Sequence, residues 1–594
     1  MRTAQEKSFS SFDGSSLFYR HWPAVSTPTR RVIVLLHRGH EHSGRLQHIA
    51  DELQMPDTTL FAWDARGHGK NSGPRGYSPS LGTTVRDLDT FIHYLCQTYG
   101  YAMEEVIVIA QSVGAVLAST WVHDYAPKIR ALILASPAFK VKLYVPLARP
   151  GLRLMEKLRG NFYVNSYVKA KFLTHDPERI ASYNTDPLIA RPISVNILLG
   201  LYDTAERIIA DAGAIQTPTQ LLISGADFVV HQAPQRTFFE RLGSPCKEMH
   251  TLEGFYHDTL GEKDRAKAFT LIRSFIQKVE AGVPNVDLSH ADKSGYTANE
   301  YQQLQQNSSP FTLKHWHFAL TRLSLATVGK LSDGIRLGWE TGFDSGSTLD
   351  YVYKNQTSGR SPLGRFGDRT YLDSVGWKGI RQRKVNLEEL IGAAIKSLTE
   401  SKQSVKIVDI AAGHGRYILD AVAGHQIDRV LLRDYSTINV EAGKALIKEK
   451  GLAHLADFQQ GDAFDQASLA NLSPAPTLAV VSGLYELFPD NAPIKASLAG
   501  LAEAVPEGGF LVYTNQPWHP QLELIARTLT SHRSGADWIM RRRTQYEMDQ
   551  LVEQAGFEKI TQRIDEWGIF TVSLARRVGK TTHSAQANSE TTQA

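Results

Sequence analysis

Two runs of consecutive apolar residues, one in each half of the chain, end in short turns of small residues. Residues 106–109 are all β-branched and predict a strand buried on both faces, and a second apolar run at 115–121 suits a helix. In the other half, residues 405–409 form a comparable strand, followed by a turn with two glycines and a helix from Tyr417. Each run therefore predicts a strand, a tight turn and a helix, the repeating unit of a parallel sheet.

Shorter apolar runs at regular intervals extend this pattern. Residues 86–99 have helical spacing and lie between predicted strands. The alternation of strands and helices predicts two α/β domains with helices on both faces of each sheet. The other predicted strands cover residues 12–20, 32–36, 59–63, 131–136, 219–224 and 246–252 in the first half, and 429–432, 457–460, 477–481 and 510–514 in the second.

Three residues with the chemistry of a serine hydrolase follow predicted strands. Ser112 occupies the turn after 106–109, Asp227 follows 219–224, and His257 follows 246–252. A serine hydroxyl needs a base to take its proton, and a carboxylate fixes the tautomer of the imidazole that does so. Taken singly, each residue also has a structural explanation, as a turn serine, a helix cap or a surface histidine. All three at strand ends, in this order, predict the triad of an α/β-hydrolase.

A polar loop with three histidines follows the strand at 32–36. His37, His40 and His42 suggest a metal site, but no carboxylate or cysteine set at ligand spacing accompanies them. We therefore expect no metal and interpret the loop as the one that supplies oxyanion donors.

The N-terminal part resembles the monoacylglycerol lipase-like branch of the α/β-hydrolases, also called serine aminopeptidase-like. The resemblance covers residues 10–280 and rests on the loop at 37–45, on 64–72 with 75–77, on the Ser112 turn, and on 173–177 with 183–187. It implies that the backbone N–H groups of Gly39 and Val113 form the oxyanion hole and that the substrate is a lipid acyl ester. Ala110, Arg38 and His40 stand where that family commonly has glycine.

A basic and apolar stretch falls where that family inserts a cap, expected over about 139–200. One interpretation is a cap whose basic face is simply solvated. The sharper hypothesis is a cap that rests on an anionic membrane and passes an acyl chain to Ser112. The six basic residues are Lys140, Lys142, Arg149, Arg153, Lys157 and Arg159.

Glycines and acids mark the second predicted site. Gly413 and Gly415 form the turn after strand 405–409, and Asp434 follows the next strand, where an acid holds ribose hydroxyls. A nicotinamide-binding or purely structural domain is the alternative, although Ile418 replaces the third glycine of the dinucleotide fingerprint.

This second region resembles class I S-adenosylmethionine-dependent methyltransferases. Residues 330–575 also look like a bacterial family of methyltransferases fused behind such a hydrolase, on the segments 342–346, 349–353 and 376–381. The resemblance implies that Asp409, Ala411, Gly413 and Gly415 line the methionine end, that Asp434 binds ribose, and that Asp462 and Ala463 bind adenine.

The methyl acceptor and its catalytic base stay open. Tyr485, Glu486, His519 and Tyr546 are candidates for the base. The run 541–543, three arginines, suggests an anionic acceptor, with a solvated charge run as the favoured alternative.

Composition and segment boundaries complete the prediction. The chain has 594 residues, 42% hydrophobic and 21% charged, with a net charge of +4, which gives no support for nucleic-acid binding. Two cysteines, no apolar signal core and no membrane-spanning run favour a cytoplasmic protein, with peripheral membrane contact open.

We expect a hydrolase domain at 1–280, a polar linker at 281–310, helices at 311–400, a methyltransferase core at 401–576 and a disordered tail at 577–594. The chain is thus expected to be a bifunctional serine ester hydrolase and methyltransferase; the rival view is that one domain is a non-catalytic binding module. Its oligomeric state is left open.

Overall fold

The computed structural model divides the chain into two compact units, Met1–Val286 and Asp287–Ala594. It describes residues 1–142, 147–166, 168–306, 308–533 and 535–578. Part of the expected cap and nearly all of the expected tail, residues 579–594, lie outside the described residues. Among the described residues, no helix is long and apolar enough to cross a membrane.

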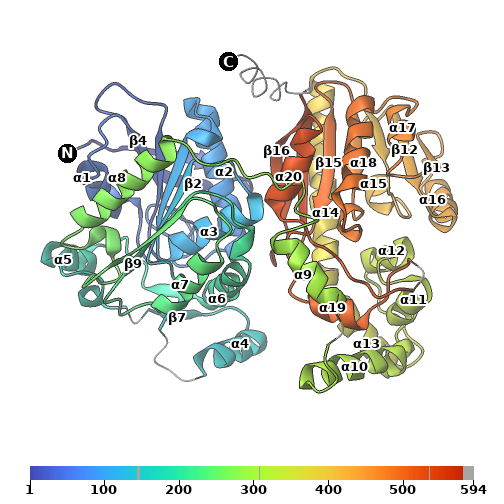
Figure 1. The fold of residues 1–594 in the computed structure, drawn as a ribbon, viewed down its shortest axis with the longest axis horizontal. Coiled ribbons are helices and arrows are strands. Elements are labelled where there is room, and N and C mark those ends of the chain that lie inside the picture. Colours follow the sequence, from blue (N-terminus) through green and yellow to red (C-terminus); the bar gives the residue numbers. More distant parts are fainter. Residues whose placement is uncertain (143–146, 167, 307, 534, 579–594) are drawn as a thin grey trace, which may run out of the picture. The chain divides into compact units, whose positions relative to one another are not determined.

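The first unit is built on a sheet of eight strands within the described residues (Figure 1). Antiparallel pairing joins the first three strands of the sheet order, and the remaining pairs are parallel. In sheet order the strands are β1 (Gln5–Ser10), β2 (Ser16–Trp22), β4 (Thr59–Trp63), β3 (Val32–Leu36), β5 (Val106–Gln111), β6 (Ala131–Ala135), β9 (Thr219–Ser224) and β10 (Lys247–Leu252).

Apolar helix faces cover this sheet and bury its central strands. Every residue of β3, β4, β5 and β6 is buried. The helices α1 and α8 share one apolar core with the sheet. The helices are α1 (Gln47–Glu52), α2 (Leu81–Tyr99), α3 (Val113–Tyr125), α6 (Val195–Ala210), α7 (Gln232–Arg241) and α8 (Ala266–Glu280).

An insertion between β6 and α6 forms the cap that the sequence predicts. It holds the exposed helix α4 (Ala148–Arg159), the helix α5 (Pro177–Thr185) and a small antiparallel pair, β7 (Tyr163–Asn165) with β8 (Pro192–Ser194). The α/β-hydrolase fold with a cap insertion is therefore confirmed.

The second unit has a sheet of seven strands among the described residues. The first five strands of the sheet order are parallel, and β17 and β16 follow with antiparallel pairing. The sheet order is β13 (Ala456–Gln460), β12 (Arg429–Asp434), β11 (Lys406–Asp409), β14 (Leu478–Val481), β15 (Phe510–Asn515), β17 (Thr571–Arg577) and β16 (Phe557–Ile564).

Chain order reverses between β11 and β14, which is the switch point where α/β sheets bind ligands. The antiparallel pair stands where a dinucleotide-binding fold has a sixth parallel strand, so the C-terminal part is confirmed as Rossmann-like and departs from the nicotinamide-binding order. One apolar core joins the sheet to α14–α16, and another joins it to α17, α18 and α20. These helices are α14 (Val375–Glu400), α15 (Arg416–Ala421), α16 (Thr437–Glu449), α17 (Gln466–Ala470), α18 (Asn491–Ala504) and α20 (Gln545–Gln554).

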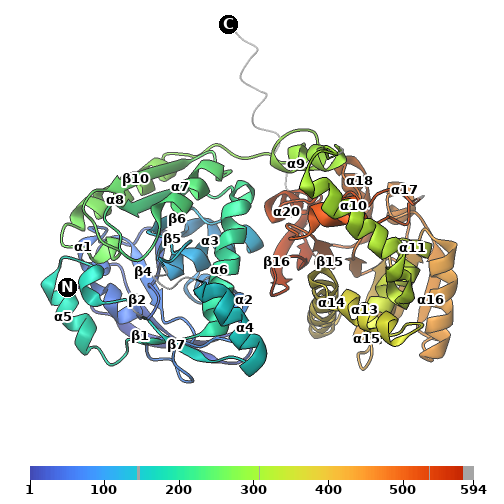
Figure 2. The ribbon, with the colours of Figure 1, turned by 90° about the horizontal axis from the view of Figure 1, so that it is seen from below.

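Four helices before α14 gather at one end of this unit (Figures 1 and 2), where a third core joins them to α19 (Leu522–Thr528). They are α10 (Leu313–Ala326), α11 (Asp333–Thr341), α12 (Gly346–Lys354) and α13 (Pro362–Leu372). The segment expected to be a polar linker contains a further helix, α9 (Tyr296–Gln305), and most of it belongs to the second unit.

Candidate active sites

Ser112 lies on a strained turn between β5 and α3. Its φ of 56° and ψ of −116° are unusual for a non-glycine residue, and it directly precedes the first residue of α3. Gly114 permits this turn, because a Cβ there would lie 2.5 Å from the carbonyl oxygen of His37. The departure at Ala110 is accommodated, since its methyl group is fully buried in β5.

The three predicted triad residues meet at the carboxyl edge of the sheet. His257 Nε2 lies 2.8 Å from Ser112 Oγ, and His257 Nδ1 lies 2.8 Å from Asp227 Oδ2. All three are at least 95% buried. This arrangement lets the imidazole take the serine proton while the carboxylate holds the opposite ring nitrogen.

Asp227 is held in its ionised form. Burial by itself would raise the pKa of Asp227. The charge of His257 and its hydrogen bond to Asp227 outweigh burial and lower this pKa below its ordinary value. The N–H groups of Val229 and Val230 also donate to Asp227 Oδ1, at 2.7 and 2.9 Å. A carboxylate fixed in this way stabilises a protonated His257.

The two expected oxyanion residues adjoin each other beside Ser112. A Cβ on Gly39 would lie 3.0 Å from Val113 Cγ2, so the loop and the start of α3 approach closely. The Val113 N–H is the first of α3 and has no carbonyl one turn earlier to bind within its helix. Both residues line the same cavity as Ser112 and His257.

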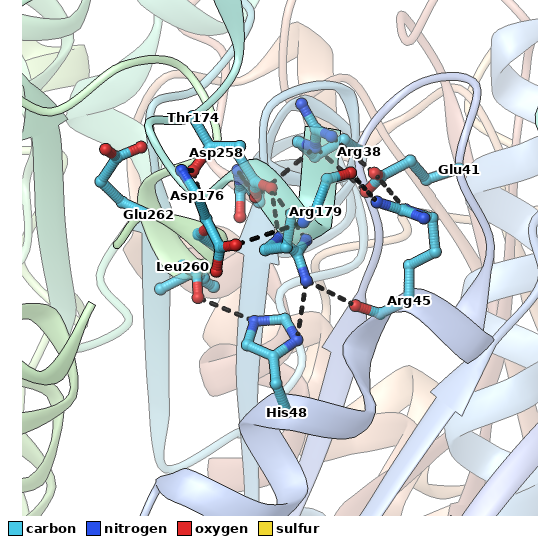
Figure 3. Close-up of polar contacts among 12 residues, drawn as sticks. Arg38, Glu41, Arg45, His48, Thr174, Asp176, Arg179, Asp258, Leu260 and Glu262 are labelled. Carbon is cyan, nitrogen blue, oxygen red and sulfur yellow. Dashed lines mark hydrogen bonds and ion pairs between the residues drawn. The ribbon is translucent and has the colours of Figure 1, made fainter. Parts of the chain in front are cut away.

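The side chain of Arg38 is tied into a buried ion-pair cluster (Figure 3). Its Nε donates to Glu41 Oε2 at 3.0 Å and lies 3.7 Å from Asp258 Oδ1. Burial opposes its charge, but Asp258 and Glu41 raise the pKa of Arg38 above its ordinary value. Burial would likewise raise the pKa of Glu41, yet Arg38 and Arg45 lower it to about 2.

The cluster connects the oxyanion loop, the end of β5 and the loop of His257 with the cap. Arg179, on α5 of the cap, donates from Nη2 to Asp258 Oδ2 at 2.8 Å (Figure 3). Gln111, next to Ser112, donates to Asp258 Oδ1 and to the His257 carbonyl, both at 3.1 Å. Asp258, Arg179 and Gln111 were not predicted as site residues, since partners so far apart along the chain leave no local pattern.

The three histidines of the oxyanion loop bind separate protein groups. His37 Nε2 accepts from the Ala65 N–H at 3.0 Å, and His42 Nε2 lies 2.9 Å from Asp186 Oδ2. His40 Nδ1 lies 2.5 Å from the carbonyl oxygen of Ala190, whose N–H donates to the His40 carbonyl at 3.0 Å. His40 thereby fastens the oxyanion loop to the cap.

An apolar cavity of about 240 Å³ opens onto Ser112. Cap residues supply much of its wall, including Leu152, Val164 and Leu173. The space suits an apolar acyl chain next to the nucleophile.

Helix α4 of the cap has an exposed apolar face. Leu154 and Leu158 are 59% and 74% exposed. Two of the expected basic residues, Arg149 and Arg153, form ion pairs with Asp203 of α6. Two of the basic side chains of the cap are therefore paired with a carboxylate, and its surface is more apolar than the sequence alone indicates.

In the second unit, the glycine turn and the predicted ribose acid lie together at the switch point. The Gly413 N–H donates to Asp434 Oδ2 at 2.9 Å, and Asn439 Nδ2 donates to Oδ1 at 3.0 Å. Ser482 Oγ, just after β14, is buried and has no hydrogen-bond partner within the described chain. A glycine turn, a carboxylate and an unsatisfied hydroxyl at this edge fit a ribose-bearing ligand.

Asp409 lies beneath this turn and supports it. Its Oδ2 accepts the Tyr417 hydroxyl, and its Oδ1 accepts the Ala411 N–H at 3.2 Å. Burial raises the pKa of Asp409 to about 7. Asp409 is fully buried, whereas Ala411, Gly413 and Asp434 keep partial exposure.

The two expected adenine residues differ in exposure. Asp462 is exposed and accepts the Phe464 N–H at 2.8 Å, whereas Ala463 is packed into the core. Gly415 faces Leu432, because a Cβ there would lie 2.5 Å from Leu432 Cδ1.

The four candidates for a methyltransferase base lie in different places. The Tyr485 hydroxyl is 2.9 Å from Ser497 Oγ inside the core. Glu486 and His519 line a second cavity, of about 500 Å³, while Tyr546 lies on α20 outside the lining that the described residues form.

The arginine run 541–543 is buried, so the favoured expectation of a solvated charge run is wrong. Arg541 binds Glu547, Arg542 Nε lies 2.5 Å from Glu300 Oε2 of α9, and Arg543 Nη1 donates to the Tyr485 carbonyl at 2.7 Å. Arg541 and Arg542 join α9 to the rest of the second unit, through Thr297 and Glu300. The burial of all three guanidinium groups also argues against an anionic acceptor at this position.

The fold and the Ser–His–Asp geometry define the first unit as an α/β-hydrolase domain, and the sheet order of the second is Rossmann-like. The chain belongs to the family described as "Putative methyltransferase", whose model matches residues 272–577. The family described as "Serine aminopeptidase, S33" matches residues 27–264.

Known relatives cover the whole chain or its first unit. The "Uncharacterized protein YnbC" of Escherichia coli (strain K12) is 58% identical over 578 residues, 97% of this chain and 99% of that protein. A monoacylglycerol lipase of Mycolicibacterium smegmatis is 25% identical over 276 residues, 46% of this chain and 97% of its own length. The crystal structure of the Paleococcus ferrophilus monoacylglycerol lipase aligns at 24% identity and a TM-score of 0.40, over 45% of this chain and 98% of that one.

Proposed function

We propose that the first unit hydrolyses monoacylglycerol-like or lysophospholipid-like acyl esters through an acyl-enzyme on Ser112. The observation that carries the proposal is the hydrogen-bonded series from Ser112 through His257 to Asp227 beside an apolar cavity. The similarity to a monoacylglycerol lipase supports this substrate class.

In this proposal each group has one role. His257 Nε2 takes the proton as Ser112 Oγ attacks the ester carbonyl, and the N–H groups of Gly39 and Val113 stabilise the oxyanion. The same nitrogen then protonates the leaving alcohol. In the second half of the reaction, His257 takes a proton from water, which attacks the acyl-enzyme and releases the fatty acid.

A fluorophosphonate probe tests the hydrolase directly. We expect an adduct on Ser112 that is found by mass spectrometry and is absent from Ser112→Ala. An intact triad without any adduct would contradict the proposal and favour the view of a non-catalytic binding module.

The exposed apolar face of α4 supports a second part of the proposal, contact of the cap with an anionic membrane. We expect flotation with anionic vesicles to fall in Leu154→Glu/Leu158→Glu, since each leucine contributes about 1.5–3 kcal/mol when buried. The matched control is Leu320→Glu/Leu323→Glu, which changes two exposed leucines of the second unit. Equal flotation of all three proteins would exclude this contact.

The second unit is proposed to be an S-adenosylmethionine-dependent methyltransferase. Asp434 would hold the ribose, the turn at Gly413 would approach the methionine part, and Asp462 with Ala463 would face the adenine. When bound, S-adenosylmethionine supplies an electrophilic methyl group on its sulfonium sulfur. The family that matches residues 272–577 and the residues at the switch point support the proposal.

Calorimetry separates this proposal from nicotinamide binding. We expect S-adenosylhomocysteine to bind the full chain and NAD to give no heat of binding. Binding of NAD alone would overturn the assignment.

A further inference from the structure

The cavity of about 500 Å³ in the second unit has apolar walls and one polar end. Its walls include Ile335, Phe343, Leu349 and Trp377, together with residues of α10, α13 and α19. Its polar end includes Arg383, Glu486 and His519. A cavity of this size with a few convergent polar groups is typical of a small-molecule site.

Several polar atoms of the cavity lining are buried without partners within the described residues. Arg383 Nη1 donates to Glu486 Oε1 at 2.9 Å, yet Arg383 Nε and Glu486 Oε2 bind nothing within the described residues. The same holds for Trp538 Nε1 and for the Tyr371 hydroxyl, which also belong to lining residues. Arg383 is 2% exposed and Glu486 6%. Unsatisfied groups at this depth cost free energy unless a ligand binds them.

His519 adds a further donor. Its Nδ1 accepts the Gln521 N–H at 3.0 Å, and burial lowers the pKa of His519 to about 4. The neutral ring therefore carries its proton on Nε2, the nitrogen next to Gly376 of the cavity wall. The polar end thus offers N–H donors together with one free carboxylate oxygen.

We propose that this cavity binds a neutral amphiphile, an apolar chain that ends in a hydroxyl group, as the acceptor substrate of the second unit. A hydroxyl donates to Glu486 Oε2 and accepts from the N–H donors, which satisfies both kinds of free atom. A carboxylate head would face the carboxylate of Glu486. Glu486 Oε2 takes the hydroxyl proton when the oxygen is methylated, and the sulfonium becomes a neutral thioether. This inference rests on the methyl-transfer function proposed above.

The cavity adjoins the predicted cofactor turn. Gly483 and Glu486 follow β14, which pairs with β11 up to Asp409. Phe343 and Asp344 line the cavity, and Gly346, two residues later, lies beside Gly413. The segment 342–346 therefore spans from the cavity to the glycine turn.

The mouth of the cavity is also apolar. Val328, Leu363 and Phe366 line it and are 58%, 61% and 71% exposed. An apolar chain can extend past these side chains, so the affinity should rise with chain length.

Gly367 of α13 offers a way to fill the cavity without distorting the backbone. It lines the cavity, and a Cβ there would meet no heavy atom within 4 Å. Gly367→Trp should occupy the space, and Gly367→Ala is the matched control for the change in helix propensity.

The test is displacement of N-phenyl-1-naphthylamine from the full chain, after an alkyl fluorophosphonate has been used to block the Ser112 pocket. We expect the affinity to rise about fourfold per added CH₂ from octanol to dodecanol. Dodecanol should bind at least tenfold more tightly than dodecanoate or dodecyl methyl ether. Gly367→Trp should weaken dodecanol binding at least tenfold, and Gly367→Ala less than twofold.

Equal dodecanol binding in wild type and Gly367→Trp would overturn the cavity as the site, and tighter binding of dodecanoate would overturn the hydroxyl head. The comparison of the Gly367 variants holds even where Ser112 fails to react. S-adenosylhomocysteine binding, measured on the same proteins, separates the two proposals. If S-adenosylhomocysteine binds and dodecanol does not, only the inference of an amphiphile site fails. If dodecanol binds and S-adenosylhomocysteine does not, the methyl-transfer proposal fails and the cavity remains an amphiphile site.

Discussion

The two candidate sites differ in how their proposed catalytic groups are paired. In the first unit, Ser112, His257 and Asp227 satisfy one another, and the surrounding ion pairs hold them in place. In the second, Arg383 Nε, Glu486 Oε2 and Ser482 Oγ lack partners within the described residues. The contrast indicates that the hydrolase site is preassembled as a hydrogen-bonded triad, whereas the proposed transfer site would be completed by its two proposed ligands.

The largest effect expected is the loss of esterase activity in Ser112→Ala. Removal of a triad nucleophile should lower kcat/KM by about 10⁴-fold or more. Hydrolysis of a monoacylglycerol, followed by fatty-acid release, measures it. S-adenosylhomocysteine binding should be unchanged. Esterase activity within tenfold of the parent would show that the triad is not the working site.

Breaking the buried cluster should destabilise the first unit. Asp258→Ala leaves Arg38 and Arg179 without a common carboxylate, and loss of one partner of a buried pair costs about 3–5 kcal/mol. Chemical unfolding measures the change. The control is Asp264→Ala, a surface residue paired with Lys267, which should leave stability unchanged. Equal stability of both variants would mean that the cluster contributes nothing net.

The pH dependence of stability should run in opposite directions in the two units. Asp409 keeps its proton in the folded state up to about pH 7, whereas an unfolded aspartate ionises near pH 3.9. Its stabilisation is therefore complete below about pH 4 and is lost as the pH rises to about 7. At pH 4 the free energy of unfolding of Asp409→Asn should not exceed that of wild type. By pH 7.5 it should have risen relative to that of wild type.

Glu41 gives the reverse case in the first unit. Its pKa of about 2 lies below the unfolded value, so its stabilisation is complete above about pH 4.5 and is lost as the pH falls to about 2. The difference in free energy of unfolding between wild type and Glu41→Gln should therefore shrink as the pH falls from about 4.5 to about 2. Differences that do not vary with pH in either pair would contradict these assignments.

The smallest effect expected concerns cofactor affinity. Asp434→Ala should weaken S-adenosylhomocysteine binding by about 10- to 100-fold, since a hydrogen bond to a charged group contributes about 1.5–3 kcal/mol. Calorimetry measures it, with the exposed Glu449→Ala as control. Unchanged affinity would remove Asp434 from the ribose site.

Local patterns predicted the strands and the order of the triad, because continuous β-branched runs and small-residue turns determine where a parallel sheet ends. The same patterns missed β1 and the antiparallel pair β16 and β17, because polar residues interrupt the apolar period of these strands, and in β17 two of the polar residues, Thr571 and Ser573, are themselves buried. They placed Asp434 beside Gly413 but not Asp258 beside Arg179, because that contact depends on how the cap folds back. The run 541–543 was misjudged because burial of charge depends on distant partners such as Glu300.

The arginines at 541–543 also decide where the chain can be cut. A fragment that starts at residue 311, after the segment that looks like a linker, would lack Glu300 and Thr297, which bind Arg542 and Arg541. The buried guanidinium groups of Arg541 and Arg542 would then each lose a hydrogen-bond partner. A fragment that starts at Asp287 keeps the whole of α9 and is the natural choice for producing the second unit separately.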